Sequence, residues 1–216
     1  MGVDTMTKKL YHQDPHQEEC TAKVTNINSN DVEVDQTIFF AFAGGQASDT
    51  GTINNIPVTE AKKAGKNIIY TLEETPPFAV GDTVTIQVDK EKRERIIKLH
   101  SAIHFAYFLL TEKIGQQKLI GSNVTDQKAR ADFAYDGSFA EILPELQEQF
   151  NELIKKNVPV RTFPSDSDPE KRIWESHGWT CPCGGTHVAS TGEIGSVILK
   201  RKTIGAGKER LEVRLA

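Results

Sequence analysis

The chain has 216 residues, enough for one large domain or two small ones, and 38% of them are hydrophobic, which is enough to form a core. No run approaches the roughly 20 consecutive apolar residues of a membrane-spanning helix, which argues against a helical membrane protein. The formal net charge of −4 argues against a general nucleic-acid coat, and the three cysteines argue against a disulfide scaffold. The first residues lack the apolar core of a secretion signal, so we expect a cytoplasmic protein.

Residues 1–89 are predicted to form a small β-barrel domain. Between Cys20 and Phe40 apolar residues alternate with polar ones on both sides of a turn at 28–31, which predicts two strands. Similar short segments follow, with turn residues at 54–55 between two of them. These further strands are expected at 51–53, 56–58, 68–72 and 83–88. Short strands at close spacing, separated by turn residues, are typical of a small barrel.

Residues 90–216 change rhythm and are predicted to form an α+β domain. From 91 to 114 the apolar residues recur every three or four positions, which indicates one face of a helix that ends at Gly115. A second helical pattern covers 139–156, with Pro144 in its first turns, where proline is best tolerated. Strands are expected at 118–124, 130–135 and 158–160, a loop at 164–170, and two strands between 194 and 215.

His100 and His104 lie four residues apart within the first predicted helix. Positions i and i+4 share one face of a helix, so both imidazole rings can reach a single ion. Zinc favours nitrogen and sulfur ligands. An H-x-x-x-H pair is a weak indication by itself, because chance and packing also produce it.

The second half of the predicted site is Cys183 and His187, which flank a double glycine. The glycines are expected to let the backbone turn so that both side chains point inward. Cys181 is an alternative sulfur ligand, and Cys183 is preferred because of the glycine pair that follows it. The sequence thus predicts one Zn²⁺ bound by His100, His104, Cys183 and His187. Four protein ligands are typical of structural zinc, whereas a catalytic ion needs an open position or a ligand that moves away.

His12 and His16 have the same spacing in an unsuitable setting. Pro15 lies between them and disrupts the helix that would align the two rings. Cys20 follows at the same spacing, but we do not expect a metal there.

Two basic clusters bear on possible partners. The first contains Lys90, Lys92, Arg93, Arg95 and Lys98, and the second contains Lys200, Arg201, Lys202, Lys208, Arg210 and Arg214. Either cluster alone is more typical of a solvated surface, whereas the two together are compatible with a polyanionic partner.

The motifs, taken in order, resemble those of AlaX proteins, the free-standing relatives of the alanyl-tRNA synthetase editing domain. The resemblance covers nearly the whole chain. It is carried by the G-G-Q loop at 44–46 with S-D-T-G at 48–51, H-S-A-I-H at 100–104, G-S-N-V at 121–124 with R-A-D-F at 130–133, N-E-L-I at 151–154 with V-P-V at 158–160, and C-G-G-T-H-V at 183–188 with T-G-E-I-G at 191–195. The zinc motifs and the G-G-Q loop in this order are highly specific.

This resemblance implies an N-terminal β-barrel and an α+β zinc domain of the kind that threonyl- and alanyl-tRNA synthetases use for editing. It implies an ATP-independent hydrolase that serves translation fidelity by cleaving the ester of mischarged alanine tRNA, most often Ser-tRNA(Ala), in trans. The G-G-Q loop points to the medium-length type. The residues expected to take part are Gln46, Asp49 and Asp132 in catalysis, Phe42, Gly44, Gly45 and Thr186 in substrate binding, and Lys90, Lys92, Arg93, Arg95 and Lys98 in tRNA binding.

One departure from the family pattern affects the expected substrate. The family often has proline and then a polar residue before the glycines, where this chain has Ala41-Phe42-Ala43. A deacylase for another amino acid, such as glycine, therefore remains an alternative, as does a non-catalytic tRNA-binding module stabilised by zinc.

Overall fold

The computed structural model describes residues 6–216 and contains two compact units. Unit 1 comprises Met1–Ala43 and Ala47–Glu94, and unit 2 comprises Gly44–Gln46 and Arg95–Ala216. The chain therefore passes from one unit to the other after Glu94, within helix α1 (Lys90–Ile114), and the three residues of the G-G-Q loop group with unit 2.

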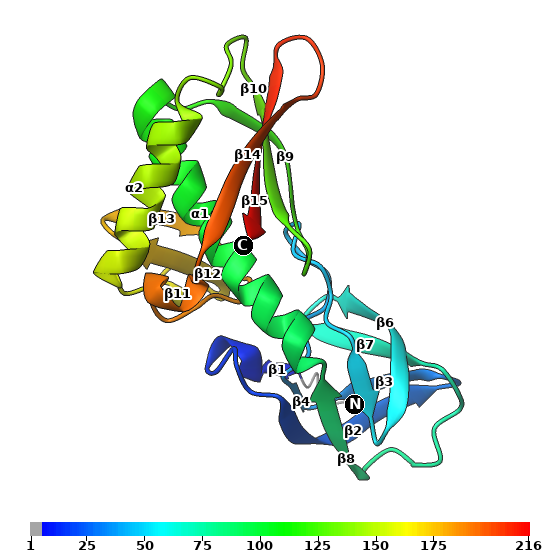
Figure 1. Cartoon of the computed structure of the whole chain (residues 1–216). Helices are drawn as coiled ribbons and strands as arrows, with labels where there is room; N and C mark the ends of the chain where they lie inside the picture. The colour runs from blue at the N-terminus through cyan, green and yellow to red at the C-terminus, as the bar shows by residue number, and fades with distance from the viewer. Residues whose placement is uncertain (1–5) are drawn as a thin grey trace. The chain divides into compact units, whose positions relative to one another are not determined.

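Unit 1 is built on a closed barrel with the strand order β2-β3-β7-β6-β5-β8, which confirms the predicted barrel (Figure 1). The strands are β2 (Glu19–Asn28), β3 (Asp31–Val34), β5 (Gly51–Ile53), β6 (Ile56–Ala64), β7 (Asn67–Leu72) and β8 (Thr83–Val88). Asn54 and Asn55 have φ of 49° and 66°, which suits a tight two-residue hairpin. Strand β6 continues to Ala64, whereas the prediction ended at Val58. The prediction was too short because the later residues of the strand are mostly exposed and show no apolar alternation.

Three short elements complete unit 1. Strands β1 (Lys8–Lys9) and β4 (Gln36–Thr37) pair in parallel, and a 3-10 turn (η1) covers Leu10–His12. The core contains the inward residues of the strands and the segment Ile38–Ala41, which leads to the G-G-Q loop.

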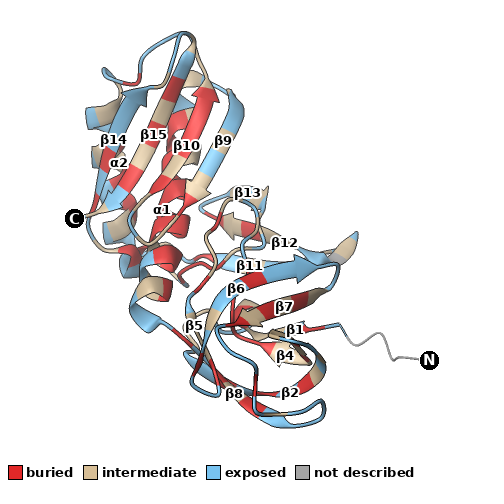
Figure 2. Ribbon diagram, turned by 90° about the vertical axis from the view of Figure 1, so that its right-hand side faces the viewer, coloured by how far each residue is buried: buried red, intermediate tan, exposed pale blue. Residues whose placement is uncertain are grey.

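Unit 2 contains a four-stranded antiparallel sheet with the order β14-β15-β10-β9. Its strands are β9 (Lys118–Val124), β10 (Ala129–Ala134), β14 (Val197–Thr203) and β15 (Lys208–Leu215), close to the predicted ranges. One face, here called the inner face, packs on the helices. Tyr107 of α1 stacks on Phe133 with ring centroids 5.9 Å apart, and Gln147 of α2 (Leu143–Lys156) accepts a hydrogen bond from Leu199 N at 2.8 Å. The four strands lie side by side in Figure 2.

A second, three-stranded sheet corrects the prediction for residues 158–182. Strands β11 (Arg161–Ser165), β12 (Asp168–Ser176) and β13 (Trp179–Pro182) pair in sequence order, where a loop at 164–170 was expected. The strand predicted at 158–160 is absent from this described segment, in which Pro159 makes only an isolated bridge to Ser190. The prediction failed because β11 is largely exposed, so its sequence shows no apolar alternation.

Both predicted helices are present. Helix α1 ends at Ile114, and Gly115 follows with φ of 72°. Helix α2 begins at Leu143 and not at 139, with Pro144 in its first turn. A 3-10 turn (η2) covers Thr191–Ile194. The α+β class is confirmed, and among residues 6–216 no helix is both long and apolar enough to cross a membrane.

Candidate metal centre and active site

Helix α1 brings the first two candidate ligands together. His100 and His104 lie one turn apart, and their rings stack with centroids 5.0 Å apart and planes inclined by 16°. Trp174 of β12 stacks on the other side of His104, with centroids 4.9 Å apart. Trp174 is fully buried, so it restricts the orientation of the His104 ring. Trp174 was not among the predicted site residues, because strand β12 was not predicted from the sequence.

The loop that carries the other two ligands is fastened to the same helix. Cys183 follows β13, and its amide donates to Arg172 O at 2.9 Å. At the far end of the loop, Val188 N donates to Ser101 Oγ at 3.0 Å. Ser101 follows His100 in the helix and is buried, so this hydrogen bond fixes the position of the loop relative to the helix.

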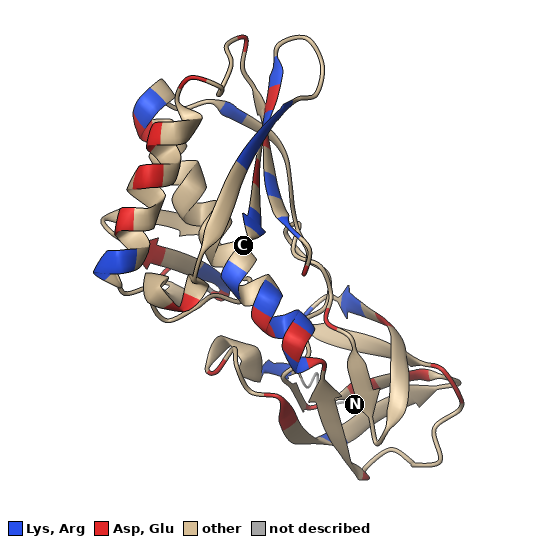
Figure 3. Cartoon of the chain, viewed as in Figure 1, with Lys and Arg blue, Asp and Glu red and all other residues tan. Residues whose placement is uncertain are grey.

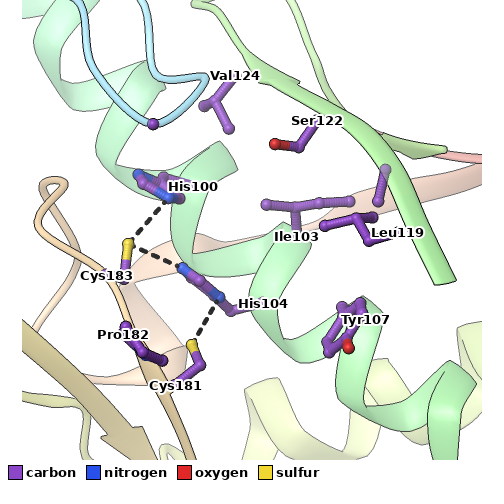
Figure 4. Close-up of a pocket in the computed structure, with 12 residues that line it drawn as sticks. His100, Ile103, His104, Tyr107, Leu119, Ser122, Val124, Cys181, Pro182 and Cys183 are labelled. Carbon is purple, nitrogen blue, oxygen red and sulfur yellow. Dashed lines mark hydrogen bonds between the residues drawn. The ribbon is translucent and has the colours of Figure 1, made fainter. Parts of the chain in front are cut away.

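The four predicted ligands converge on one point. Cys183 Sγ lies 3.4 Å from His100 Nε2, 3.3 Å from His104 Nε2 and 3.4 Å from His187 Nε2. One donor atom from each of the four residues lies within 4.8 Å of all the others. Figure 4 shows His100, His104 and Cys183 pointing toward one another.

This geometry fits zinc. Tetrahedral coordination with Zn–N of about 2.0–2.1 Å and Zn–S of about 2.3 Å places sulfur and nitrogen about 3.6 Å apart. The three sulfur–nitrogen distances of 3.3–3.4 Å are close to that value. The donor set of three imidazoles and one thiol is also one that zinc prefers.

Gln46 of the G-G-Q loop sets the protonation of His100. Its Oε1 accepts from the backbone N of Thr186 at 3.0 Å and lies 2.7 Å from His100 Nδ1. Because a backbone N–H can only donate, the atom facing it is the amide oxygen, and Nδ1 must carry the proton that it shares with that oxygen. His100 Nε2 is therefore unprotonated and faces Cys183, as a metal ligand requires.

Cys181, the alternative sulfur ligand, occupies a different position. Its Sγ lies 3.5 Å from His104 Nδ1, whereas Cys183 Sγ lies 3.3 Å from Nε2 of the same ring. The two sulfurs thus contact opposite nitrogens of His104. This arrangement favours Cys183 as the metal ligand, whereas Cys181 contacts the His104 nitrogen that faces away from the cluster.

Burial favours the neutral forms of His100, His104 and Cys183. Burial lowers the pKa of His104 to about 4, and burial together with the nearby His104 lowers that of His100 well below its ordinary value. Burial raises the pKa of the Cys183 thiol to about 11, against a lowering by the Gly185 amide. At neutral pH the His100 and His104 imidazoles are ready to bind a cation, whereas the Cys183 thiol must lose its proton.

The double glycine has a different use from the predicted one. Neither Gly184 nor Gly185 has a positive φ, so the turn itself does not require glycine. A Cβ on Gly185 would lie 2.2 Å from His100 Cε1 and 2.4 Å from Gln46 Oε1. Gly185 is therefore needed for close approach, whereas the nearest heavy atom to a Cβ on Gly184 is Arg172 Cγ at 4.0 Å.

A cavity of ≈ 280 Å³ opens beside the cluster. His100, His104, Cys181 and Cys183 form its polar wall, and Ser122 adds a hydroxyl. The remaining wall is mostly apolar and includes Ile103, Leu119, Val124 and Ala131. In Figure 4 the side chains of Ile103, Leu119 and Ser122 lie across the space from the cysteines. The cavity can therefore hold a small group next to the metal ligands.

The two glycines of the G-G-Q loop have different surroundings. Gly44 lines the cavity, with φ of 58°. Gly45 has φ of 85°, and a Cβ there would lie 3.0 Å from Ser122 Oγ. Gly45 O also accepts from Val124 N at 2.8 Å, so the loop is bound to strand β9.

Several other predicted residues have structural contacts. Thr186 is buried and its hydroxyl accepts from Gln46 Nε2 at 3.0 Å, so it supports Gln46 and does not face the cavity. Phe42 belongs to unit 1, is 60% exposed and does not line the cavity. Asp132 pairs with Arg130 and Arg210 on the face of the sheet opposite the helices. These contacts do not support the predicted substrate-binding roles of Thr186 and Phe42 or the catalytic role of Asp132.

Asp49 and Arg93, predicted in catalysis and tRNA binding, form a buried ion pair in unit 1. Asp49 Oδ1 accepts from Arg93 Nε at 2.9 Å, and its Oδ2 accepts from Phe40 N at 2.6 Å. Arg93 is 1% exposed and also donates to Ile38 O at 2.6 Å. A guanidinium so enclosed cannot reach a phosphate, so Arg93 must be removed from the predicted RNA-binding cluster.

The rest of that cluster is more accessible. Lys90 is exposed beside Glu18, and Arg95 is exposed while its Nε donates to Asp126 O at 2.8 Å. Lys92 and Lys98 are half-buried. Elsewhere, His16 Nδ1 lies 2.6 Å from Glu94 Oε1, and Cys20 is buried in the barrel.

Comparison with known proteins defines the class of this fold and site. Residues 172–212 match the family described as threonyl and alanyl tRNA synthetase second additional domain, and residues 4–92 match the family of class II (A) tRNA synthetases. The alanine–tRNA ligases of Methanococcus maripaludis and Ignicoccus hospitalis are 31% and 30% identical over 95% of this chain. The chain spans 26% of the length of each of these ligases. The chain is thus similar to the part of alanine–tRNA ligases that contains the second additional domain.

A more complete match defines the family. The alanyl-tRNA editing protein AlaX-M of Pyrococcus horikoshii is 34% identical over 215 residues, which cover 97% of this chain and 98% of that protein. The chain belongs to the AlaX family of alanyl-tRNA editing proteins, as its motifs predicted.

Proposed function

We propose that the protein deacylates mischarged alanine tRNA in trans, with Ser-tRNA(Ala) as its principal substrate and zinc as its metal. Membership of a family of alanyl-tRNA editing proteins makes it an aminoacyl-tRNA deacylase, a hydrolase of the ester bond. Its near-complete coverage of AlaX-M, against about a quarter of each ligase, supports action on a tRNA released by the synthetase. We infer that it acts on this substrate in the cytoplasm.

The observation that carries this proposal is the convergence of three histidine Nε2 atoms on Cys183 Sγ beside the cavity. When bound there, zinc supplies a Lewis acid that can hold a substrate amino group or hydroxyl, or lower the pKa of a water to about 7. His100, His104 and Cys183 line the cavity, so a metal held by these residues and His187 would lie beside a substrate bound there.

The chain's own residues would position the substrate and the ligands. Gly44 leaves room for the 3′ end of the tRNA, because it lines the cavity and no heavy atom of a non-adjacent described residue lies within 4 Å of the position of a Cβ there. Gln46 holds the proton on His100 Nδ1 and so keeps Nε2 available. The apolar wall formed by Ile103 and Val124 would exclude bulk water from the ester.

Serine is favoured by the chemistry of the error and by the polar groups of the cavity. A synthetase pocket for alanine rejects an analogue with one added hydroxyl only weakly, by about 10². A second site that offers hydrogen bonds to that hydroxyl can discriminate further. Ser122 and the metal cluster offer such groups in a cavity whose other lining is mostly apolar.

The proposal is tested with a panel of alanine tRNA charged with serine, glycine or alanine. We expect rapid release of serine, little release of alanine, and loss of activity with a chelator that zinc restores. Cys183→Ala should abolish both zinc binding and deacylation. Cys20→Ala is the matched control, because that thiol is buried in the barrel and should leave both unchanged.

Other outcomes would replace the proposal with a specific alternative. Faster release of glycine than of serine would make the protein a glycine deacylase. Protection of every ester, with tight tRNA binding, would make it a non-catalytic tRNA-binding module. Full activity in Cys183→Ala and in a variant without both Cys181 and Cys183 would show that the proposed metal site is not used.

A further inference from the structure

We propose that the outer face of the four-stranded sheet in unit 2, the face opposite the helices, binds the sugar–phosphate backbone of tRNA. The inference rests on the proposed function for the identity of the RNA. It assigns a role to the C-terminal basic residues, and it concerns a surface different from the one that the cavity occupies.

The strand register defines which side chains share this face. Arg130 and Asp132 of β10 pair with Glu212 and Arg210 of β15, and these in turn pair with Lys200 and Lys202 of β14. Cross-strand partners lie on the same side of a sheet. The alternate residues Ala131, Leu211 and Leu199 are buried on the inner face. The outer face is therefore the polar one.

The outer face carries a high positive charge. Its cationic residues in the strands are Lys118, Arg130, Lys200, Lys202, Lys208, Arg210 and Arg214. Lys128 joins them through its ion pair with Glu212 at 2.7 Å. With Asp132 and Glu212 as the acidic members, eight cations and two anions give a net charge of +6, and the remainder of the chain carries −10 because its total is −4. Figure 3 shows Lys and Arg along these strands.

The two carboxylates organise this charge without neutralising it. Asp132 Oδ1 accepts from Arg210 Nε at 2.7 Å, and its Oδ2 pairs with Arg130. Glu212 is shared in the same way between Lys128 and Arg214. Within residues 6–216 no ion pair holds Lys200 or Lys202, both of which are exposed. Fixed arginines and free lysines together suit a row of phosphates.

The composition of the face selects backbone contacts over base contacts. Its strands carry no aromatic side chain in the outward positions, so unpaired bases would find no stacking platform. Ile198 is exposed, but the neighbouring outward positions are charged, which disfavours an apolar partner. A duplex that presents phosphates is the partner with matching charge.

The surface and the cavity lie on opposite sides of the same strands. Ala131 and Ser122 line the cavity, whereas their neighbours Arg130 and Asn123 face outward. Strand β9 is at the edge of the sheet, where the G-G-Q loop covers its end at Asn123 and Val124. Within residues 6–216 no strand other than β10 pairs with its earlier residues 118–122. The double-stranded part of a tRNA can therefore lie on the outer face while its single-stranded 3′ end passes β9 to the cavity.

The test removes two charges from the surface and two from elsewhere in unit 2. The surface variant is Lys200→Gln with Lys202→Gln, and the control is Lys155→Gln with Lys156→Gln at the exposed end of α2. Uncharged alanine tRNA is titrated at several salt concentrations. If both surface lysines contact phosphates, the slope of log K against log salt falls by about 2, and affinity at 0.15 M salt falls about 30-fold. The control should stay within about twofold of the parent, and both variants should retain their metal content and thermal melt.

Further measurements separate this proposal from the proposed function. A short single-stranded oligonucleotide that ends in CCA and carries serine cannot reach the surface, so its deacylation should be equal in the parent and the surface variant. Equal tRNA affinity of the surface variant and the parent would overturn the proposal while leaving the deacylase assignment intact. Loss of binding in both variants alike, or stronger binding to anionic phospholipid vesicles than to tRNA, would also overturn it.

Discussion

Replacement of Gly185 by alanine should disrupt the metal site through one added methyl group. Ordinary contacts begin at about 3.4 Å, whereas the new Cβ would lie 2.2 Å from His100 Cε1 and 2.4 Å from Gln46 Oε1. The ring would have to retreat by about 1.2 Å and the amide by about 1.0 Å. Metal–ligand distances tolerate changes of only about 0.2 Å, so the ring cannot remain a ligand after such a shift.

The expected energies follow from the same displacement. Overpacking of this kind costs about 1–3 kcal/mol of folding free energy, and loss of a ligand's supporting contact lowers metal affinity about 10–100-fold. A misplacement near 1 Å in an active site can lower a rate about 100-fold. We therefore expect Gly185→Ala to bind zinc at least tenfold more weakly and to deacylate Ser-tRNA(Ala) about 100-fold more slowly.

Gly184→Ala is the matched control, because the same methyl group one residue earlier would meet only Arg172 Cγ at 4.0 Å. The assays are zinc competition with a chromogenic chelator, thermal unfolding with and without zinc, and single-turnover deacylation. Gly184→Ala should stay within twofold of the parent in each. Parental zinc affinity and melting in Gly185→Ala would refute the reasoning, because they would mean that the loop moves away from His100 without disturbing the site.

Three further predictions concern the hydrogen bond from Gln46 to His100, the pH dependence of zinc binding, and the buried ion pair in unit 1. Gln46→Ala should lower zinc affinity about 10–100-fold, because the tautomer of His100 is no longer held by a hydrogen bond. Gln46→Glu keeps an acceptor for His100 Nδ1 and should retain most of the zinc affinity. Equal loss of affinity in both variants would contradict the proposed role of the tautomer. Zinc affinity should rise about tenfold per pH unit between about pH 7 and 8, because the Cys183 thiol has a pKa of about 11 and must release its proton, whereas His104, with a pKa of about 4, is already neutral. Calorimetry in buffers of different ionisation enthalpy should count one proton, and a count of two or more would contradict this assignment. Arg93→Met should lower the free energy of unfolding, measured in urea, by about 3–5 kcal/mol because it leaves the Asp49 carboxylate buried without its cation. Zinc stoichiometry should not change. An unaffected urea midpoint would make Arg93 a candidate for RNA contact again.

The elements that local pattern predicted are those with one buried face. Helix α1 and the barrel strands show clear periodicity because alternate or every third and fourth residues enter a core. The hairpin of β11 and β12 lacks that signal, since β11 is mostly exposed and its Pro and Ser residues resemble a loop. Trp174 was missed for the same reason, although it packs on a candidate ligand.

Charge and spacing were poor guides to the roles of single residues. Arg93 lies within a run of cations, and nothing in that run distinguishes the one whose side chain turns inward to Asp49. Asp132 belongs to a family motif, yet its strand position places it on the outer face with two arginines. Strand alternation determines that face, and it is known only when the register of the sheet is known.

The sequence by itself determined the family, the two kinds of domain and the four candidate ligands, because each of those depends on short motifs whose spacing is a local property of the chain. Only the tertiary structure decided how the ligands are supported. Gln46 lies 54 residues before His100, and its hydrogen bond selects the nitrogen that faces Cys183. Residue 185 must be glycine because His100, on a helix from elsewhere in the chain, lies where a side chain would be. Such contacts arise when distant segments pack, and no periodicity in the sequence records them.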